Sequence, residues 1–251
     1  MKRYQRQMML SGWGIVTQKR LKHATVLVVG AGGLGCPAAL NLVLAGVGQI
    51  RICDFDTVEM SNLNRQFLHT ERSIGTDKAR SAQATLSAIN SEVAIEPISR
   101  KITEENVDDI VGDAQVILDC LDNFSDRYIL NQCAVRKRIP MVHGAVWGLE
   151  GRVTFLHPPE TPCLKCMFPI APTQEQLPVV GATPCATGAM QALETIKYLT
   201  GMGSLLSGRM LILDFSTMQF QELEVLRNPQ CPACGSLTGE DGNGNEKKRD
   251  L

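Results

Sequence analysis

Residues 25–35 read TVLVVGAGGLG, an apolar, β-branched run that passes directly into a glycine-rich loop. The run predicts a strand that is buried on both faces, as strands of a parallel sheet are. Gly30, Gly32 and Gly35 match the spacing G-x-G-x-x-G, and Gly33 adds a fourth glycine. Without side chains in the way, backbone N–H groups at the start of a helix can approach an anion closely. The stretch therefore predicts a strand, a phosphate-binding loop and a helix, in that order.

The segments after the loop complete a β–α–β unit. Residues 36–48 have helical composition, and the helix is expected to stop at Gly46 or Gly48. Residues 50–54 read IRICD and predict the second strand. Strands and helices then keep alternating, with strands predicted at 93–98, 116–120 and 140–145 and helices at 76–90, 103–112 (capped by Thr103) and 123–138. Such alternation predicts an α/β fold with a doubly wound, Rossmann-like, mostly parallel sheet.

The pattern changes after residue 145. A C-terminal antiparallel extension is expected, with strands at 152–156, 210–215 and 218–226 and a helix at 188–201. Residues 236–251 contain almost no apolar side chains, so we expect a disordered tail there. The sequence thus predicts one domain over residues 1–235, which begins with a helical segment over residues 1–24.

The charge balance restricts the possible partners. With 25 basic and 26 acidic residues the net charge is −1, which disfavours nonspecific nucleic-acid binding because that requires a basic surface. No apolar run is long enough to span a bilayer, and the first ten residues, MKRYQRQMML, lack the apolar core of a signal peptide. We therefore expect a cytoplasmic protein that binds neither nucleic acid nor membrane. Reducing conditions there make disulfides a poor explanation for the nine cysteines.

Four of the cysteines form two CxxC pairs, which are Cys163 with Cys166 and Cys231 with Cys234. Two thiolates at this spacing can bind one ion, and two such pairs complete a tetrahedral zinc site. A closed four-thiolate shell has no open position, so the zinc is expected to be structural. A redox dithiol and unrelated buried cysteines are the alternatives.

The remaining cysteines and the histidines carry weaker signals. Four cysteines are expected to be buried as small apolar residues, namely Cys36, Cys53, Cys120 and Cys133. Cys185 lies just before the predicted helix 188–201, whose N-terminus could lower the pKa of a thiol. A reactive role for Cys185 therefore stays open beside an inert one. The four histidines show no metal-ligand spacing and are expected in surface or hydrogen-bonded polar positions.

The glycine loop alone is compatible with NAD or FAD as well as with ATP. Asp54 follows the second strand, where a carboxylate can accept hydrogen bonds from ribose hydroxyls. The next part of the chain, however, favours phosphate chemistry, since it holds Asn62, Arg65 and Gln66 and then Lys78 at the start of a helix. An ordinary solvated loop is the alternative for this group.

Asp122 ends the fourth predicted strand, at the edge of a parallel sheet where ligands bind. A carboxylate beside phosphates is a natural ligand for Mg²⁺. Its alternative role is to cap the helix that follows.

Five motifs occur along the chain in a recognisable order, namely RYQRQ at 3–7, GAGGLG at 30–35, DFDTVEMSNLNRQFL at 54–68, GTDKA at 75–79 and DCLDN at 119–123. In combination they are similar to the superfamily that includes the ubiquitin-activating (E1-like) enzymes. The branch they resemble comprises the bacterial molybdopterin-synthase and thiamine sulfur-carrier adenylyltransferases and the HesA-like proteins. The resemblance extends from about residue 3 to Gly235.

The resemblance assigns roles to individual residues. It implies that the glycine loop and Asp54 hold ATP, that Arg65 and Lys78 contact its phosphates, and that Asp122 binds Mg²⁺. Supporting positions in the ATP site are Asn62 on the phosphates, Gln66 in the pocket and Asn123 beside Asp122. Arg6 matches an arginine that reaches the ATP site of a partner subunit, so the resemblance also implies a homodimer. Taken alone, Arg6 reads as a surface arginine.

The implied reaction is ATP-dependent adenylation of the C-terminal glycine of a ubiquitin-like sulfur carrier that ends in Gly-Gly. The carrier could be of the molybdopterin-synthase small-subunit type or of the thiamine type. Since no sulfurtransferase domain follows residue 251, we expect a separate sulfur donor, such as a cysteine desulfurase or a rhodanese. Two rival functions remain at this stage. They are an NAD-dependent oxidoreductase on the same fold and a non-catalytic module that binds a carrier.

Overall fold

One eight-stranded sheet organises the chain in a computed structural model that describes residues 2–172 and 178–238. The strand order is β3-β2-β1-β4-β5-β6-β7-β8. The strands are β1 (Thr25–Val29), β2 (Gln49–Cys53), β3 (Ala94–Ile98), β4 (Val116–Asp119), β5 (Met141–Trp147), β6 (Glu150–Leu156), β7 (Arg209–Asp214) and β8 (Gln219–Glu224). The first five are parallel and the last three antiparallel. The predicted doubly wound α/β sheet with its antiparallel extension is confirmed.

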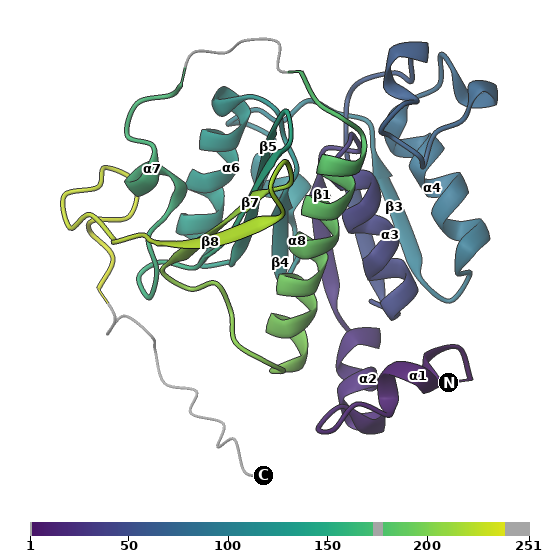
Figure 1. The fold of residues 1–251 in the computed structure, drawn as a ribbon, viewed down its shortest axis with the longest axis horizontal. Coiled ribbons are helices and arrows are strands. Elements are labelled where there is room, and N and C mark those ends of the chain that lie inside the picture. The colour runs from purple at the N-terminus through teal and green to yellow at the C-terminus, as the bar shows by residue number, and fades with distance from the viewer. Residues whose placement is uncertain (1, 173–177, 239–251) are drawn as a thin grey trace.

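Helices cover both faces of the parallel part of the sheet. The α-helices are α1 (Gln5–Met8), α2 (Gly14–Lys22), α3 (Gly35–Ala45), α4 (Lys78–Ile89), α5 (Val107–Val111), α6 (Phe124–Lys137), α7 (Leu164–Met167) and α8 (Ala182–Thr200). One core lies between the sheet and α2, α3, α4 and α8, and a second lies between the sheet and α5, α6 and α7. Figure 1 shows α3 and α8 side by side on the first face.

Strand β1 explains why this part of the sequence reads as a continuous apolar run. Val26 and Val28 face the α3 and α8 side, whereas Leu27 and Val29 face the α5 and α6 side. All four side chains are buried, because successive residues of a strand point to opposite faces and both faces are covered here. The glycine loop that follows β1 therefore starts from a strand in the interior of the fold.

The predicted helix over 103–112 is shorter in the structure, and its predicted cap is wrong. Helix α5 begins after Asn106, not after Thr103. The Asn106 side-chain oxygen accepts a hydrogen bond from the Thr103 N–H at 2.9 Å, which holds residues 103–106 in a turn outside the helix.

Helix α8 begins at Ala182, six residues before the predicted start at 188. Pro184 lies in its first turn, where the missing N–H would have had no partner within the helix. Cys185 consequently lies inside the helix, and its N–H donates to the Gly181 carbonyl at 3.3 Å. The expectation that Cys185 precedes the helix is wrong.

The N-terminal segment is helical, as predicted, and packs against the end of α3. Both Gln7 and Gln18 donate to the Ala45 carbonyl, at 2.7 and 3.0 Å. Within the described part of the chain, no helix is long and apolar enough to cross a membrane. Most of the predicted disordered tail, residues 239–251, lies outside the described residues.

Candidate functional site

The glycine loop lies where the order of the sheet reverses. Strand β1 stands between β2 and β4, and Val29 is in register with Cys53 on one side and with Asp119 on the other. The chain segments that follow these three strands therefore leave the sheet at the same edge. In open α/β sheets, ligands bind in the crevice at this switch point.

Two positions of the loop require glycine, because a backbone carbonyl oxygen lies too close to each of them for a side chain. Gly30 has φ +98°, a conformation that side chains other than glycine rarely adopt, and a Cβ on it would lie 2.6 Å from the Cys120 carbonyl oxygen. A Cβ on Gly35 would lie 1.7 Å from the Gly30 carbonyl oxygen. The loop thus folds back on itself before α3 begins, which leaves its backbone bare at the helix start.

Asp54 holds the loop from the end of β2. Its Oδ2 accepts a hydrogen bond from the Ala31 N–H at 2.7 Å, and its Oδ1 accepts one from the Asp56 N–H at 2.9 Å. Burial raises the pKa of Asp54, although the Ala31 N–H and the charge of Lys78 oppose the rise. Each carboxylate oxygen has a further lone pair, so the same group can also accept from a ribose hydroxyl.

Lys78 and Arg65 bring two cations to the same edge. Lys78 is the first residue of α4 and is buried. Its Nζ lies 2.8 Å from Oδ2 of Asp56. Arg65 lies beside the loop, and the Cγ atom of Arg65 would be 3.6 Å from a Cβ placed on Gly33. Nη1 of Arg65 donates to the Ser61 carbonyl and to Oδ1 of Asn64, both at 2.9 Å. Both cations keep further N–H donors for a phosphate.

Gln66 and Asn62 support this region in different ways. Gln66 lies next to the loop, with its Nε2 3.6 Å from the position of a Cβ on Gly32. Its Oε1 is buried and has no hydrogen-bond partner among the described residues. The Oδ1 of Asn62 accepts from the Glu59 N–H at 3.1 Å, so that oxygen shapes the turn before Arg65.

Asp122 is exposed and forms no hydrogen bond or ion pair with the described residues, whereas its neighbour Asn123 is occupied. Oδ1 of Asn123 accepts from the Asp126 N–H at 2.9 Å and caps α6. The alternative role of Asp122 as the helix cap is therefore wrong. Its carboxylate is available to a ligand at the carboxyl end of β4, which fits the ligand preference of Mg²⁺.

The structure does not bring Arg6 to the glycine loop of its own chain. Arg6 is exposed on α1, and α1 packs against the C-terminal end of α3, whose other end adjoins the loop. The 11 residues of α3 span roughly 16 Å. In Figure 1, α1 and α2 accordingly lie below the sheet, where β1 begins.

Sequence reasoning missed a contact that His69 makes with the loop. His69 is buried, with Nε2 2.9 Å from the Ala31 carbonyl oxygen and Nδ1 3.0 Å from Oγ of Ser81. Burial lowers the pKa of His69, so the neutral ring is favoured. The expected hydrogen-bonded polar position is confirmed, but the partner is 38 residues away in sequence and no local pattern announces it.

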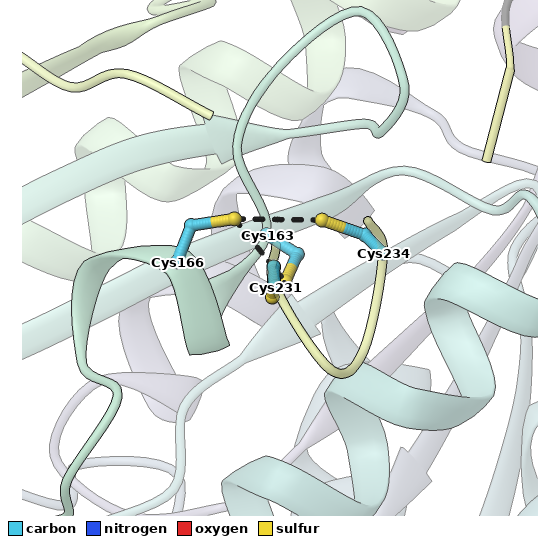
Figure 2. A group of neighbouring side chains, drawn as sticks. All are labelled: Cys163, Cys166, Cys231 and Cys234. Atoms are coloured by element: carbon cyan, nitrogen blue, oxygen red, sulfur yellow. Dashed lines mark hydrogen bonds between the residues drawn. The ribbon is translucent and has the colours of Figure 1, made fainter. Parts of the chain in front are cut away.

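The four CxxC cysteines converge at one point (Figure 2). Sγ–Sγ distances are 3.9 Å from Cys163 to Cys166, 3.7 Å from Cys163 to Cys231 and 3.4 Å from Cys166 to Cys234. A disulfide would need about 2.05 Å. Tetrahedral zinc with Zn–S bonds of about 2.3 Å places its sulfurs about 3.8 Å apart, so the cluster has the dimensions of a zinc site.

The chemistry of these thiols also fits a metal. Burial raises the pKa of Cys163, and burial raises that of Cys234 to about 11. These two thiols stay protonated unless a cation stabilises their thiolates. At Cys231, burial is outweighed by hydrogen bonds from the Cys234 and Ala233 backbone and from the neighbouring thiols, which lower its pKa. The cluster joins the chain after β6 to the chain after β8.

The other cysteines lie where expected. Cys36, Cys53, Cys120 and Cys133 are buried within the two cores.

Two cavities, of about 520 and 620 Å³, lie away from the glycine loop and contain none of the predicted site residues. The predicted nucleotide site therefore lies outside these two cavities.

Comparison with known proteins identifies relatives over most of the chain. The sequence model of the ThiF family matches residues 4–233. The SAMP-activating enzyme E1 of Haloferax volcanii is 41% identical over 239 residues, covering 93% of this chain and 88% of that protein. The sulfur carrier protein adenylyltransferase of Thermus thermophilus is 41% identical over 244 residues, covering 93% and 90%.

The adenylyltransferase and sulfurtransferase MOCS3 of Drosophila persimilis is 42% identical over 241 residues, which cover 93% of this chain and 53% of that protein. The chain thus spans about half the length of MOCS3. Among solved structures, Escherichia coli MccB with ATP has a TM-score of 0.84 at 22% identity, covering 93% of this chain and 73% of that one. PaaA has a TM-score of 0.79 at 24% identity, covering 90% and 82%. At these identities the two structures establish a shared fold.

Proposed function

This chain belongs to the ThiF family, and on that premise we propose that it is an ATP-dependent adenylyltransferase for the C-terminal glycine of a ubiquitin-like sulfur carrier. The observation that carries the proposal is the set of groups at one edge of the sheet. There, a bare glycine loop held by Asp54 lies beside two cations, Arg65 and Lys78, and Asp122 follows the neighbouring strand. The name of the Thermus thermophilus relative supports the same activity.

The residue types suit the chemistry. A carboxylate oxygen of the carrier would attack the α-phosphorus of ATP, the bond to the bridging oxygen would break, and pyrophosphate would leave with the electron pair. Both reactants are anionic, so neutralising charge and positioning the groups supply most of the catalysis. Arg65 can bind phosphate oxygens bidentately, and Lys78 acts as a point charge. No side-chain nucleophile is needed for this step, so the reaction does not depend on Cys185.

Two metal ions belong to the proposal. Asp122 would hold Mg²⁺, which supplies further charge neutralisation to the phosphates of ATP. Asn123 lies beside it, although its own Oδ1 caps α6. Zinc would sit in the four-cysteine cluster as a structural ion, since four thiolates leave no open position.

The function is tested by exchange of labelled pyrophosphate into ATP. We expect Mg²⁺-dependent exchange that appears when a carrier ending in Gly-Gly is added, because adenylation is reversible while pyrophosphate is present. The panel should include carriers of the molybdopterin-synthase and thiamine types, and the same carriers lacking the terminal glycine serve as controls.

The same experiment separates the rival functions. Tight NAD(H) binding without carrier-dependent exchange would favour an oxidoreductase. Carrier binding without exchange would favour a non-catalytic module. If folded, zinc-loaded protein gives no exchange with the whole panel, the proposed adenylation is wrong.

We further propose a homodimer in which Arg6 serves the ATP site of the partner subunit. Arg6 is exposed and far from its own loop, which supports a role across an interface. Arg6→Ala and Asp122→Ala subunits, each inactive alone, are expected to regain exchange when mixed, up to about a quarter of the wild-type rate if the subunits mix at random and one intact site forms per mixed dimer. Arg3→Ala, which alters an exposed arginine on the preceding turn, is the matched control. Absence of recovery in verified mixed dimers would count against the shared site.

The wider setting follows from the same premise. We propose that the chain acts in the cytoplasm and that its adenylated carrier receives sulfur from a separate donor, such as a cysteine desulfurase or a rhodanese. The folded unit would be the single domain over residues 1–235.

A further inference from the structure

A buried cluster that contains charged side chains lies at the end of β4, just before Asp122 along the chain. Asp119, the last residue of β4, is fully buried. Its Oδ2 lies 2.6 Å from Nδ1 of His143 on β5, and its Oδ1 lies 3.5 Å from Nε of Arg127 on α6. His143 is 1% exposed and Arg127 is 5% exposed, so these groups are removed from water together.

This cluster holds the peptide groups that lead into Asp122. The Leu121 N–H donates to Oδ1 of Asp119 at 3.2 Å. On the other side of the same residue, the Leu121 carbonyl accepts from Nη2 of Arg127, which also donates to the Gly144 carbonyl at 2.9 Å. Leu121 is thus fixed at both its N–H and its C=O, and the next residue along the chain is Asp122.

His143 completes the cluster by occupying the second carboxylate oxygen. Burial lowers the pKa of His143, so the ring stays neutral and its Nδ1–H donates to Asp119. Burial alone would raise the pKa of Asp119, but the charge of Arg127 and the bond from His143 hold it below its ordinary value. The pair is therefore a buried carboxylate and a neutral imidazole, and without His143 the Oδ2 atom would lose its hydrogen-bond partner.

Aromatic contacts tie His143 to the same segment. The Phe168 ring lies 6.2 Å from the His143 ring and 5.2 Å from the Phe124 ring, centroid to centroid. Phe124 is the first residue of α6 and follows Asn123 directly. Phe168 lies just beyond α7, two residues after Cys166, so the ring of His143 contacts the segment that follows the first cysteine pair.

We propose that His143 is a positioning residue for Asp122, acting through the Asp119 carboxylate and the Leu121 peptide. The inference rests on the proposed function, in which Asp122 binds the Mg²⁺ of Mg²⁺–ATP. Partners that orient a metal ligand from behind commonly change metal affinity when they are removed. Here His143 does not touch Asp122. It acts through Asp119 and then through the Leu121 peptide, which precedes Asp122 in the backbone.

The test uses two substitutions that differ in where they place an amide N–H. In His143→Asn, Nδ2 can take the place of Nδ1 and donate to Asp119. In His143→Gln, Nε2 takes the place of the far ring nitrogen and leaves Oδ2 of Asp119 unpaired. Asp119→Asn is a second disrupting variant, because it removes the negative charge that lies against Arg127 and leaves a single acceptor oxygen in place of two.

The first readout is the half-saturating Mg²⁺ concentration in pyrophosphate exchange. The second is the dissociation constant of Mn²⁺ from the protein–ATP complex, measured by electron paramagnetic resonance without turnover. We expect both constants to rise roughly tenfold, which means weaker metal binding, in His143→Gln and in Asp119→Asn. His143→Asn should stay within about twofold of wild type. Leu206→Ala, a core deletion at the opposite edge of the sheet, controls for lost stability alone and should leave both constants unchanged.

Folded His143→Gln or Asp119→Asn protein with wild-type constants overturns the inference. It is equally overturned if His143→Asn and His143→Gln shift the constants alike. Failure of the proposed function looks different, because wild-type protein would then show no exchange at all. In that case the Mn²⁺ measurement on the ATP complex still compares the variants.

Discussion

Replacing Asp122 with alanine is expected to lower carrier-dependent pyrophosphate exchange by on the order of a hundredfold or more, without unfolding the protein. Asp122 is exposed and bonds to none of the described residues, so its loss removes little that stabilises the fold. It would remove the carboxylate proposed to bind the Mg²⁺ of the substrate. The measurement is the initial exchange rate at saturating ATP and carrier, together with the thermal unfolding midpoint.

A second aspartate, located before β4 where Asp122 is located after it, provides the matched control for this substitution. Asp113 is also exposed, but it precedes β4 and therefore lies at the opposite edge of the sheet. Asp113→Ala should retain wild-type exchange. Wild-type exchange in Asp122→Ala as well would refute the assigned role and would leave the phosphate site to Arg65 and Lys78.

Replacing Cys231 with serine is expected to abolish stoichiometric zinc binding and to destabilise the fold. Three thiolates and an alcohol make a much weaker zinc site, and the binding free energy of a structural ion contributes to folding. A loss on the order of 3 kcal/mol would lower the unfolding midpoint by about 10 °C in a domain of this size. Zinc content per chain and thermal unfolding, with and without a chelator, measure the two effects.

Cys185→Ser is the control for this prediction, because Cys185 belongs to α8 and lies outside the four-cysteine cluster. It should retain one zinc per chain and the wild-type midpoint. A metal-free Cys231→Ser protein that unfolds at the wild-type temperature would show that the cluster is dispensable for stability.

Most of the fold could be predicted because its signals are local. The β1 strand reads as an apolar run since both of its faces are buried, and Gly46 ends α3 in the left-handed conformation that glycine favours. The misplaced boundaries have equally local causes that the sequence pattern concealed. A turn held by the Asn106 side chain shortens α5. Helix α8 begins earlier than predicted because Pro184 is part of its first turn.

The candidate site was predictable in composition but not in its supporting contacts. Arg65, Lys78 and Asp122 could be chosen from residue type and from their place after strands. The hydrogen bond from His69 to Ala31 and the pairing of His143 with Asp119 join residues 38 and 24 positions apart. No periodicity encodes such pairs, because they depend on which strands become neighbours.

The sequence by itself determined the order of strands and helices, the glycine loop and the two cysteine pairs, because spacing along the chain is enough to specify each of them. Tertiary structure decided which of these parts meet. Parallel pairing of β1 with β2 and β4 brought Asp54 and Asp122 to the edge of the glycine loop. Packing of α1 on the far end of α3 kept Arg6 away from that loop. These outcomes depend on the burial of apolar surface between elements distant in sequence, and that burial is a property of the whole fold.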